Sequence, residues 1–293
     1  MYSEITSNKR RTWVLIIVFV GITAALGYVI DWYFEAGGIL TVVALGYSGI
    51  TATASYFAGD KVALAISGAK EIEKKDAPEL FRLVENLCIA NGTPMPKVYV
   101  IEDDAPNAFA TGRDPKHSSV AFTTGLIRRL DRPELEGVVA HELSHIKNYD
   151  IRTMTVVVVL VGTVAIMADL FIRAQWFGGN SRRKEGGGIL LIVGIVLIVL
   201  APIIAQLIKL AVSRQREYLA DASGSLLTRY PEGLARALEK ISATEAPLKQ
   251  ASTATAHLFI ASPFGTKKNM LTGLFATHPP AAERISRLRA MGA

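Results

Sequence analysis

The chain has 293 residues, of which half are hydrophobic, and its mean hydropathy of +0.31 favours a protein that is partly embedded in a lipid bilayer. Its single cysteine excludes an intramolecular disulfide framework. The net charge of +6 could suggest a nucleic-acid partner, but the basic residues do not alternate with aromatic ones and many flank apolar segments, so we expect attraction to anionic lipid headgroups and no nucleic-acid binding.

Four long apolar segments predict membrane helices. Each is long enough to span about 30 Å of hydrocarbon as an α-helix, and the only charged residue among them is Asp169. A soluble core helix is the alternative for any one of them, but few soluble domains contain four. The segments are residues 13–30, 39–57, 154–172 and 189–208.

Basic residues predict the orientation of the first hairpin. Lys9, Arg10 and Arg11 precede it and Lys61 follows it, whereas its loop, residues 31–38, contains no Lys or Arg. By the positive-inside rule, the soluble part of the chain should face the cytoplasm. The second hairpin has a basic loop of its own, so it either crosses the bilayer or dips into it.

These segments divide the chain into four parts. An N-terminal transmembrane hairpin (1–59) is followed by the first part of a soluble domain (60–150), a second transmembrane or membrane-embedded hairpin (151–212) and the second part of the domain (213–293). We expect this domain to be mainly α with a small β-sheet. Its predicted elements are a helix from Asp76, with Glu79 completing a capping box, to Asn91, strands at 97–101 and 118–124, and helices at 231–241 and 280–291.

The segment His141-Glu142-Leu143-Ser144-His145 has the pattern of a zinc hydrolase motif. Asp131 and Glu134 form a capping-box pattern that predicts a helix through the motif. Residues four apart share one face of a helix, so both imidazoles could bind one ion. Glu142 lies about 100° around that helix, where it could accept a proton from water without being a ligand. Such a five-residue match also arises by chance.

Two carboxylates further along the chain complete the predicted metal site. Glu217 and Asp221 lie four residues apart in a segment of helical composition. We assign Glu217 as the third metal ligand and Asp221 as the group that fixes the tautomer of a ligand histidine. Two histidines and one glutamate with an open fourth position are typical of catalytic zinc. A solvent-exposed acidic helix face is the alternative.

The distance along the chain between His145 and Glu217 constrains the topology. If both bind one ion, the chain between them crosses the membrane an even number of times. If their helices also continue straight into the apolar segments, the ion lies roughly 13 Å from the bilayer surface.

Two further features have both a functional and an ordinary interpretation. Asn107, Ala108, Phe109 and Ala110 belong to a small-residue loop or edge strand, which either pairs with a peptide substrate or simply connects two elements. His278 precedes the final helix, and it either stabilises the oxyanion formed in peptide hydrolysis or is a solvent-accessible helix-entry residue.

Taken together, these motifs resemble the HtpX-like membrane zinc metalloproteases, relatives of the type I CAAX prenyl proteases. The resemblance implies a zincin-like (gluzincin) domain, one Zn²⁺ per subunit, and a multi-pass endopeptidase of the cell membrane that cleaves damaged or misfolded membrane proteins. It is carried by residues 106–112, 141–145, 217–221, 254–260 and 277–280.

Other functions remain open at this level. A prenyl-protein-type processing peptidase is a narrower alternative within the enzyme class. A non-catalytic scaffold stabilised by zinc is another, although a structural site has no use for Glu142. A transporter would place ionisable groups in the middle of its spans, and only Asp169, near a predicted end, intrudes. The oligomeric state is not predicted.

Overall fold

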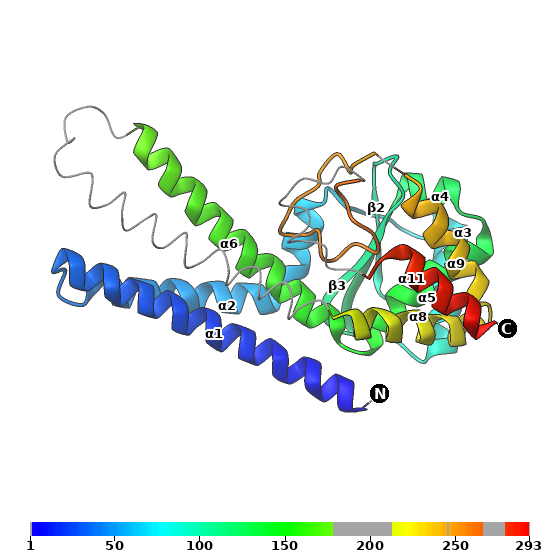
Figure 1. The fold of residues 1–293 in the computed structure, drawn as a ribbon, viewed down its shortest axis with the longest axis horizontal. Coiled ribbons are helices and arrows are strands. Elements are labelled where there is room, and N and C mark those ends of the chain that lie inside the picture. Colours follow the sequence, from blue (N-terminus) through cyan, green and yellow to red (C-terminus); the bar gives the residue numbers. More distant parts are fainter. Residues whose placement is uncertain (1, 178–212, 245, 266–278, 293) are drawn as a thin grey trace.

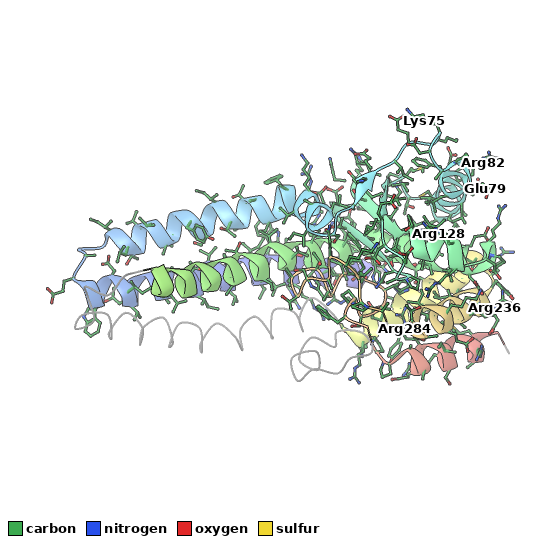
Figure 2. The ribbon with its side chains drawn as sticks, turned by 90° about the horizontal axis from the view of Figure 1, so that it is seen from above. Lys75, Glu79, Arg82, Arg128, Arg236 and Arg284 are labelled. Carbon is green, nitrogen blue, oxygen red and sulfur yellow. The ribbon has the colours of Figure 1, made fainter. Side chains whose placement is uncertain are left out.

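The computed structural model describes residues 2–177, 213–244, 246–265 and 279–292 (Figure 1). Three long helices extend together from one side of a mixed α/β domain: α1 (Tyr2–Phe34), α2 (Ile39–Ile66) and α6 (Asp150–Phe177). Figure 2 shows them running side by side. The predicted membrane segment 189–208 lies outside the described residues.

Two of these helices have the properties of membrane spans. By length and composition, Ile5–Trp32 of α1 and Ile39–Ile66 of α2 could each cross a bilayer. Helix α6 covers the third predicted apolar segment and packs against both. The contact between α2 and α6 is close, because a Cβ added to Gly59 would lie 2.8 Å from the Thr155 side chain.

The domain contains a four-stranded sheet in the order β1-β2-β4-β3. Strands β2 and β4 are parallel, whereas the other two pairs are antiparallel, so β3 forms one edge. A buried apolar core lies between this sheet and the helices that cover it. The strands are β1 (Lys70–Glu71), β2 (Lys97–Ile101), β3 (Ala108–Asp114) and β4 (His117–Thr123); the domain helices are α3 (Pro78–Asn91), α4 (Thr124–Arg129), α5 (Arg132–Lys147), α8 (Arg214–Thr228), α9 (Pro231–Ser242) and α11 (Ala281–Met291).

Helix capping agrees with the sequence at one predicted position and differs at the other. The capping box of Asp131 and Glu134 is present at the start of α5. The predicted box at Asp76 is wrong: Ala77 is the N-cap of α3 and makes no side-chain cap. The Asp76 carboxylate instead accepts a hydrogen bond from the Glu73 backbone N–H, which closes the preceding turn.

Helix α5, which carries the predicted metal-binding motif, does not continue straight into α6, the helix of the third apolar segment. The predicted distance between the ion and the bilayer surface assumed that it does. Helix α5 ends at Lys147 and α6 begins at Asp150, and Tyr149 between them has a left-handed backbone with φ 61°. The two helices are therefore joined by a sharp turn. As a result, the first residue of α6 lies beside the last turn of α5, close to His145.

Glycine allows α5 to lie against α9. A Cβ added to Gly137 would lie 2.7 Å from the Leu234 backbone nitrogen and 2.9 Å from its Cα. These are backbone atoms, which cannot move without shifting the whole helix. The close packing of α5 against α9 therefore requires glycine at residue 137.

We predict that Gly137→Ala destabilises the domain. The overpacking should lower the free energy of unfolding by roughly 1–3 kcal/mol, despite the better helix propensity of alanine. Thermal unfolding of the purified protein in detergent measures this change. Gly21→Ala is the control, because nothing lies within 4 Å of a Cβ added there. Equal melting temperatures for the two variants would contradict the proposed close contact.

Candidate metal centre

Three ligand-type side chains converge between α5 and α8. The Nε2 atoms of His141 and His145 lie 3.2 Å apart, and Glu217 Oε1 lies 3.6 Å from Nε2 of His145. Glu217 Oε2 lies 3.9 Å from Nε2 of His141. One ligand atom from each residue falls within 4.8 Å of the others, and all three side chains are buried. The group could therefore hold a metal ion.

The spacing fits a single tetrahedral ion. Nitrogen and oxygen ligands about 2.0–2.1 Å from zinc would lie about 3.3 Å from one another. The observed separations of 3.2, 3.6 and 3.9 Å approach this value, and the carboxylate needs only a small rotation to match it. Two imidazole nitrogens and a carboxylate oxygen held this closely, away from solvent, are arranged as ligands of one cation.

Each histidine is oriented by a carboxylate on its far side. His141 Nδ1 lies 3.0 Å from Asp221 Oδ1, and His145 Nδ1 lies 3.0 Å from Asp150 Oδ2. A carboxylate at this nitrogen fixes the ring so that Nε2 faces the centre. Asp221 was expected from the sequence. Asp150 was missed, because its approach to His145 depends on the sharp turn between α5 and α6.

A buried arginine from α11 holds the first of these carboxylates. Arg284 donates two hydrogen bonds to Asp221, of 2.9 and 2.7 Å, and a third to the Ile260 carbonyl at 3.1 Å. It is 2% exposed and is among the largest fully buried side chains of the described residues. Figure 2 labels it. Sequence reasoning missed it, because nothing marks it beyond its place in the predicted final helix, residues 280–291.

Glu142 lies beside the centre and is also buried. Burial, together with the charge of Glu217, raises the pKa of its carboxyl to about 7, although His145 and Arg284 oppose this shift. A carboxylate with a pKa near neutrality can both accept and donate a proton at physiological pH. Its position is therefore suited to general-base chemistry.

Burial lowers the pKa of one histidine, whereas neighbouring carboxylates raise the pKa of the other. Burial, with a contribution from Arg284, lowers the pKa of His141 to about 4. Burial also opposes charge on His145, but the hydrogen bond to Asp150 and the charge of Glu217 outweigh it and raise its pKa to about 9. Burial tends to raise the pKa of Asp221 as well, yet the charge of Arg284 lowers it to about 2.

The predicted substrate strand forms the edge strand β3, but much of its free edge is already occupied. The Ala108 carbonyl accepts a hydrogen bond from the Ile260 backbone N–H at 2.9 Å, and the Asn107 side chain donates to the Ala261 carbonyl at 3.0 Å. Farther along, the Gly112 N–H donates to a side chain of α6. Between these contacts, the Ala110 backbone lies next to the Glu142 carboxylate and helps to lower its pKa.

The remaining histidines do not join the centre in the described residues. His257 is buried, and its Nε2 lies 2.9 Å from the Met154 carbonyl at the start of α6. His117 is exposed and contacts Asp114. His278, the predicted oxyanion stabiliser, lies outside the residues that the structure describes.

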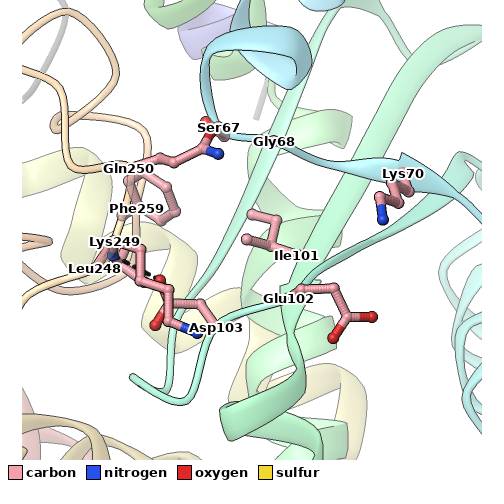
Figure 3. A pocket seen from close by; sticks show the side chains of 10 residues that line it. All are labelled: Ser67, Gly68, Lys70, Ile101, Glu102, Asp103, Leu248, Lys249, Gln250 and Phe259. Atoms are coloured by element: carbon pink, nitrogen blue, oxygen red, sulfur yellow. Dashed lines mark hydrogen bonds between the residues drawn. The ribbon is translucent and has the colours of Figure 1, made fainter.

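A small pocket elsewhere in the domain has a different character (Figure 3). It lies between the end of α2, the end of β2 and the segment around residue 249, and the metal-centre residues do not line it. At its wall the Asp103 carboxylate accepts a hydrogen bond from the Lys249 backbone N–H at 2.7 Å. This contact attaches the 246–265 segment to the sheet.

Known proteins resemble this chain in sequence and in fold. The model of peptidase family M48 matches residues 74–292. Three proteins named Protease HtpX homolog are similar over nearly their whole length: those of Dictyoglomus thermophilum (48% identity, 99% of this chain and 95% of the relative), Tropheryma whipplei (46%, 100% and 99%) and Streptococcus gordonii (42%, 99% and 100%). The crystal structure of S. mikatae Ste24p is similar in fold, with a TM-score of 0.50 and 21% identity, over 98% of this chain and 66% of that one.

We predict that metal affinity rises with pH. Because the pKa of His145 is raised to about 9, the metal-free centre carries a proton there at neutral pH, and a bound cation must displace it. The affinity for Zn²⁺ should therefore increase between pH 7 and pH 9, by up to about tenfold per pH unit for one displaced proton. Competition with a chelator of known pH dependence measures it. An affinity that is flat over this range would contradict the assignment.

Proposed function

The chain belongs to peptidase family M48, and we propose that it is a zinc-dependent endopeptidase that cleaves damaged or misfolded membrane proteins on the cytoplasmic side of the membrane. The observation that carries this proposal is the convergence of His141, His145 and Glu217, with the buried Glu142 beside them. A purely structural zinc site would be closed by a fourth protein ligand and would not need a general base.

In the proposed mechanism, His141, His145 and Glu217 would hold the ion. A zinc ion held there would supply Lewis acidity, which polarises a scissile carbonyl and makes water more acidic. Glu142 accepts a proton from the attacking water and then delivers it to the departing amine.

Positioning residues keep the ligand set fixed during these steps. Asp221 and Asp150 hold the two imidazoles by their Nδ1 atoms. Arg284 neutralises Asp221 and ties it to the Ile260 backbone. Because the carboxylate and the guanidinium are both buried, neither is free to rotate toward water. The ligands therefore meet a substrate in a nearly preformed arrangement.

The arrangement of helices supports membrane proteins as substrates. The relatives and the two apolar helices indicate a membrane protein, and α6 starts at Asp150, in contact with a proposed metal ligand. The proposed centre therefore lies at the base of the helical bundle. We propose that it acts there on segments that emerge from the bilayer.

We predict that Glu142→Gln abolishes peptide cleavage while zinc binding and folding persist. The amide has nearly the same shape but cannot accept a proton, and a lost general base typically costs about 10²–10⁴-fold in rate. Cleavage of an unfolded, detergent-solubilised membrane protein measures the effect, and metal analysis checks the zinc content.

Glu136→Gln is the matched control. It makes the same chemical change on the same helix, at a side chain that pairs with Arg132 on the surface. It should cleave at the wild-type rate. If Glu142→Gln also cleaved at that rate, the proposed role of Glu142 would be lost; if wild-type protein with bound zinc cleaved nothing, the scaffold alternative would gain support.

We also predict the orientation of the chain. In a Cys88→Ser background, Glu35→Cys in the exposed α1–α2 loop should react with a membrane-impermeant maleimide in right-side-out vesicles. Lys75→Cys, whose native side chain is 75% exposed on the domain, should react only in inside-out vesicles. The reverse labelling pattern would overturn the proposed cytoplasmic site.

A further inference from the structure

A buried asparagine connects the first long helix with the metal centre. Asn8 lies near the start of α1 and is completely buried. Its side-chain nitrogen donates hydrogen bonds to Asp150 Oδ1 at 2.6 Å and to the Asn148 carbonyl at 2.9 Å. These two acceptors flank Tyr149, the residue with the left-handed backbone. Asn8 therefore fastens the sharp turn between α5 and α6.

The same contact leads directly to a proposed metal ligand. Asp150 uses one oxygen for Asn8 and the other for His145 Nδ1, which lies 3.0 Å away. The carboxylate is 1% exposed, so water cannot replace either partner. Arg216 of α8 also approaches it, with 3.7 Å between Nη1 and Oδ1. Of these three distances, the one to the Asn8 amide is the shortest.

We propose that Asn8 is a positioning residue of the metal centre, acting through Asp150 on His145. This inference rests on the proposed function, because it assumes that His145 binds zinc. A carboxylate that orients a ligand histidine must itself be held, and partners of this kind strongly affect metal affinity. The amide suits this position because its two N–H groups can hold Asp150 and the Asn148 carbonyl together.

The first candidate membrane span therefore also helps to position the metal centre. Asn8 lies near the first residue of the candidate span Ile5–Trp32 within α1. Figure 1 shows its N-terminal end passing beneath the start of α6. A displacement of α1 relative to α6 would pull Asn8 from Asp150 and loosen the hold on His145.

The simpler explanation is that Asn8 only joins α1 to α6, and a neighbouring contact distinguishes the two. One turn further along α1, the Thr12 hydroxyl contacts the Thr153 hydroxyl of α6 at 3.0 Å. Both threonines are completely buried, as Asn8 is, and their hydroxyls donate to the Asn8 backbone carbonyl at 3.0 and 3.3 Å, but among the contacts described neither reaches the Asn8 side chain or Asp150. Thr12→Val is therefore a matched control for loss of a polar contact at the same helix interface.

The test measures zinc release from the full-length protein in detergent. Zinc-loaded wild type and the variants Asn8→Leu, Thr12→Val, Asp150→Asn and Asn8→Leu/Asp150→Asn are mixed with a chromophoric chelator. Asn8→Leu should release zinc about tenfold faster than wild type, and Asp150→Asn at least as fast. Thr12→Val should release it at the wild-type rate. The double variant should match Asp150→Asn alone, because Asn8 acts through that carboxylate.

The visible spectrum of the Co²⁺-substituted protein gives a second readout, because it reports ligand geometry rather than fold. It should change in Asn8→Leu and not in Thr12→Val. If Asn8→Leu does not yield folded protein, Asn8→Ser is measured in the same way.

Equal release rates for Asn8→Leu and Thr12→Val, or an Asn8 effect that persists in the Asp150→Asn background, would overturn the positioning role. A wild-type protein that retains no zinc would instead contradict the proposed zinc centre itself.

Discussion

The close approach of helices α5 and α8 is the contact on which the centre depends. Gly224 of α8 lies under His141, and a Cβ there would be 3.0 Å from the His141 backbone nitrogen. Since the two backbones nearly touch, Glu217 and Asp221 of α8 can reach opposite nitrogens of the same imidazole. A wider separation would leave the ligand set incomplete, although each helix could still form.

Burial of so many charges is tolerated because each has a partner. Isolated ions inside a protein are costly, and a buried pair is stable only when its hydrogen bonds are satisfied. Arg284 meets this condition for Asp221, and His145 with Asn8 meets it for Asp150. Glu217 lies 3.7 Å from the Arg284 guanidinium as well as near both histidines, and a cation held by Glu217 and the histidines would compensate its charge further. The surrounding network thus favours a bound metal.

Short-range patterns in the sequence predicted much of this arrangement. They could not predict the contacts between residues far apart in the chain. The capping box at Asp131 and the four-residue spacing within each motif are local properties of a helix, and the structure retains them. Asp76 shows the limit, because its carboxylate served a preceding turn rather than the helix that follows. Asn8 and Arg284 carry no local signature of a metal site, since their roles arise only when distant helices pack.

The origin of these partners bears on how the proposed protease is organised. One histidine is oriented from within the domain, by Asp221 and Arg284, and the other by Asp150 and Asn8 at the starts of two long helices. If all the orienting residues lay within the domain, the metal centre would keep its geometry when the long helices moved relative to one another. Here the second imidazole is held by α6 and α1 themselves. The geometry of the centre is therefore coupled to the packing of those helices, and a lipid environment that separates them should weaken the site without touching any ligand.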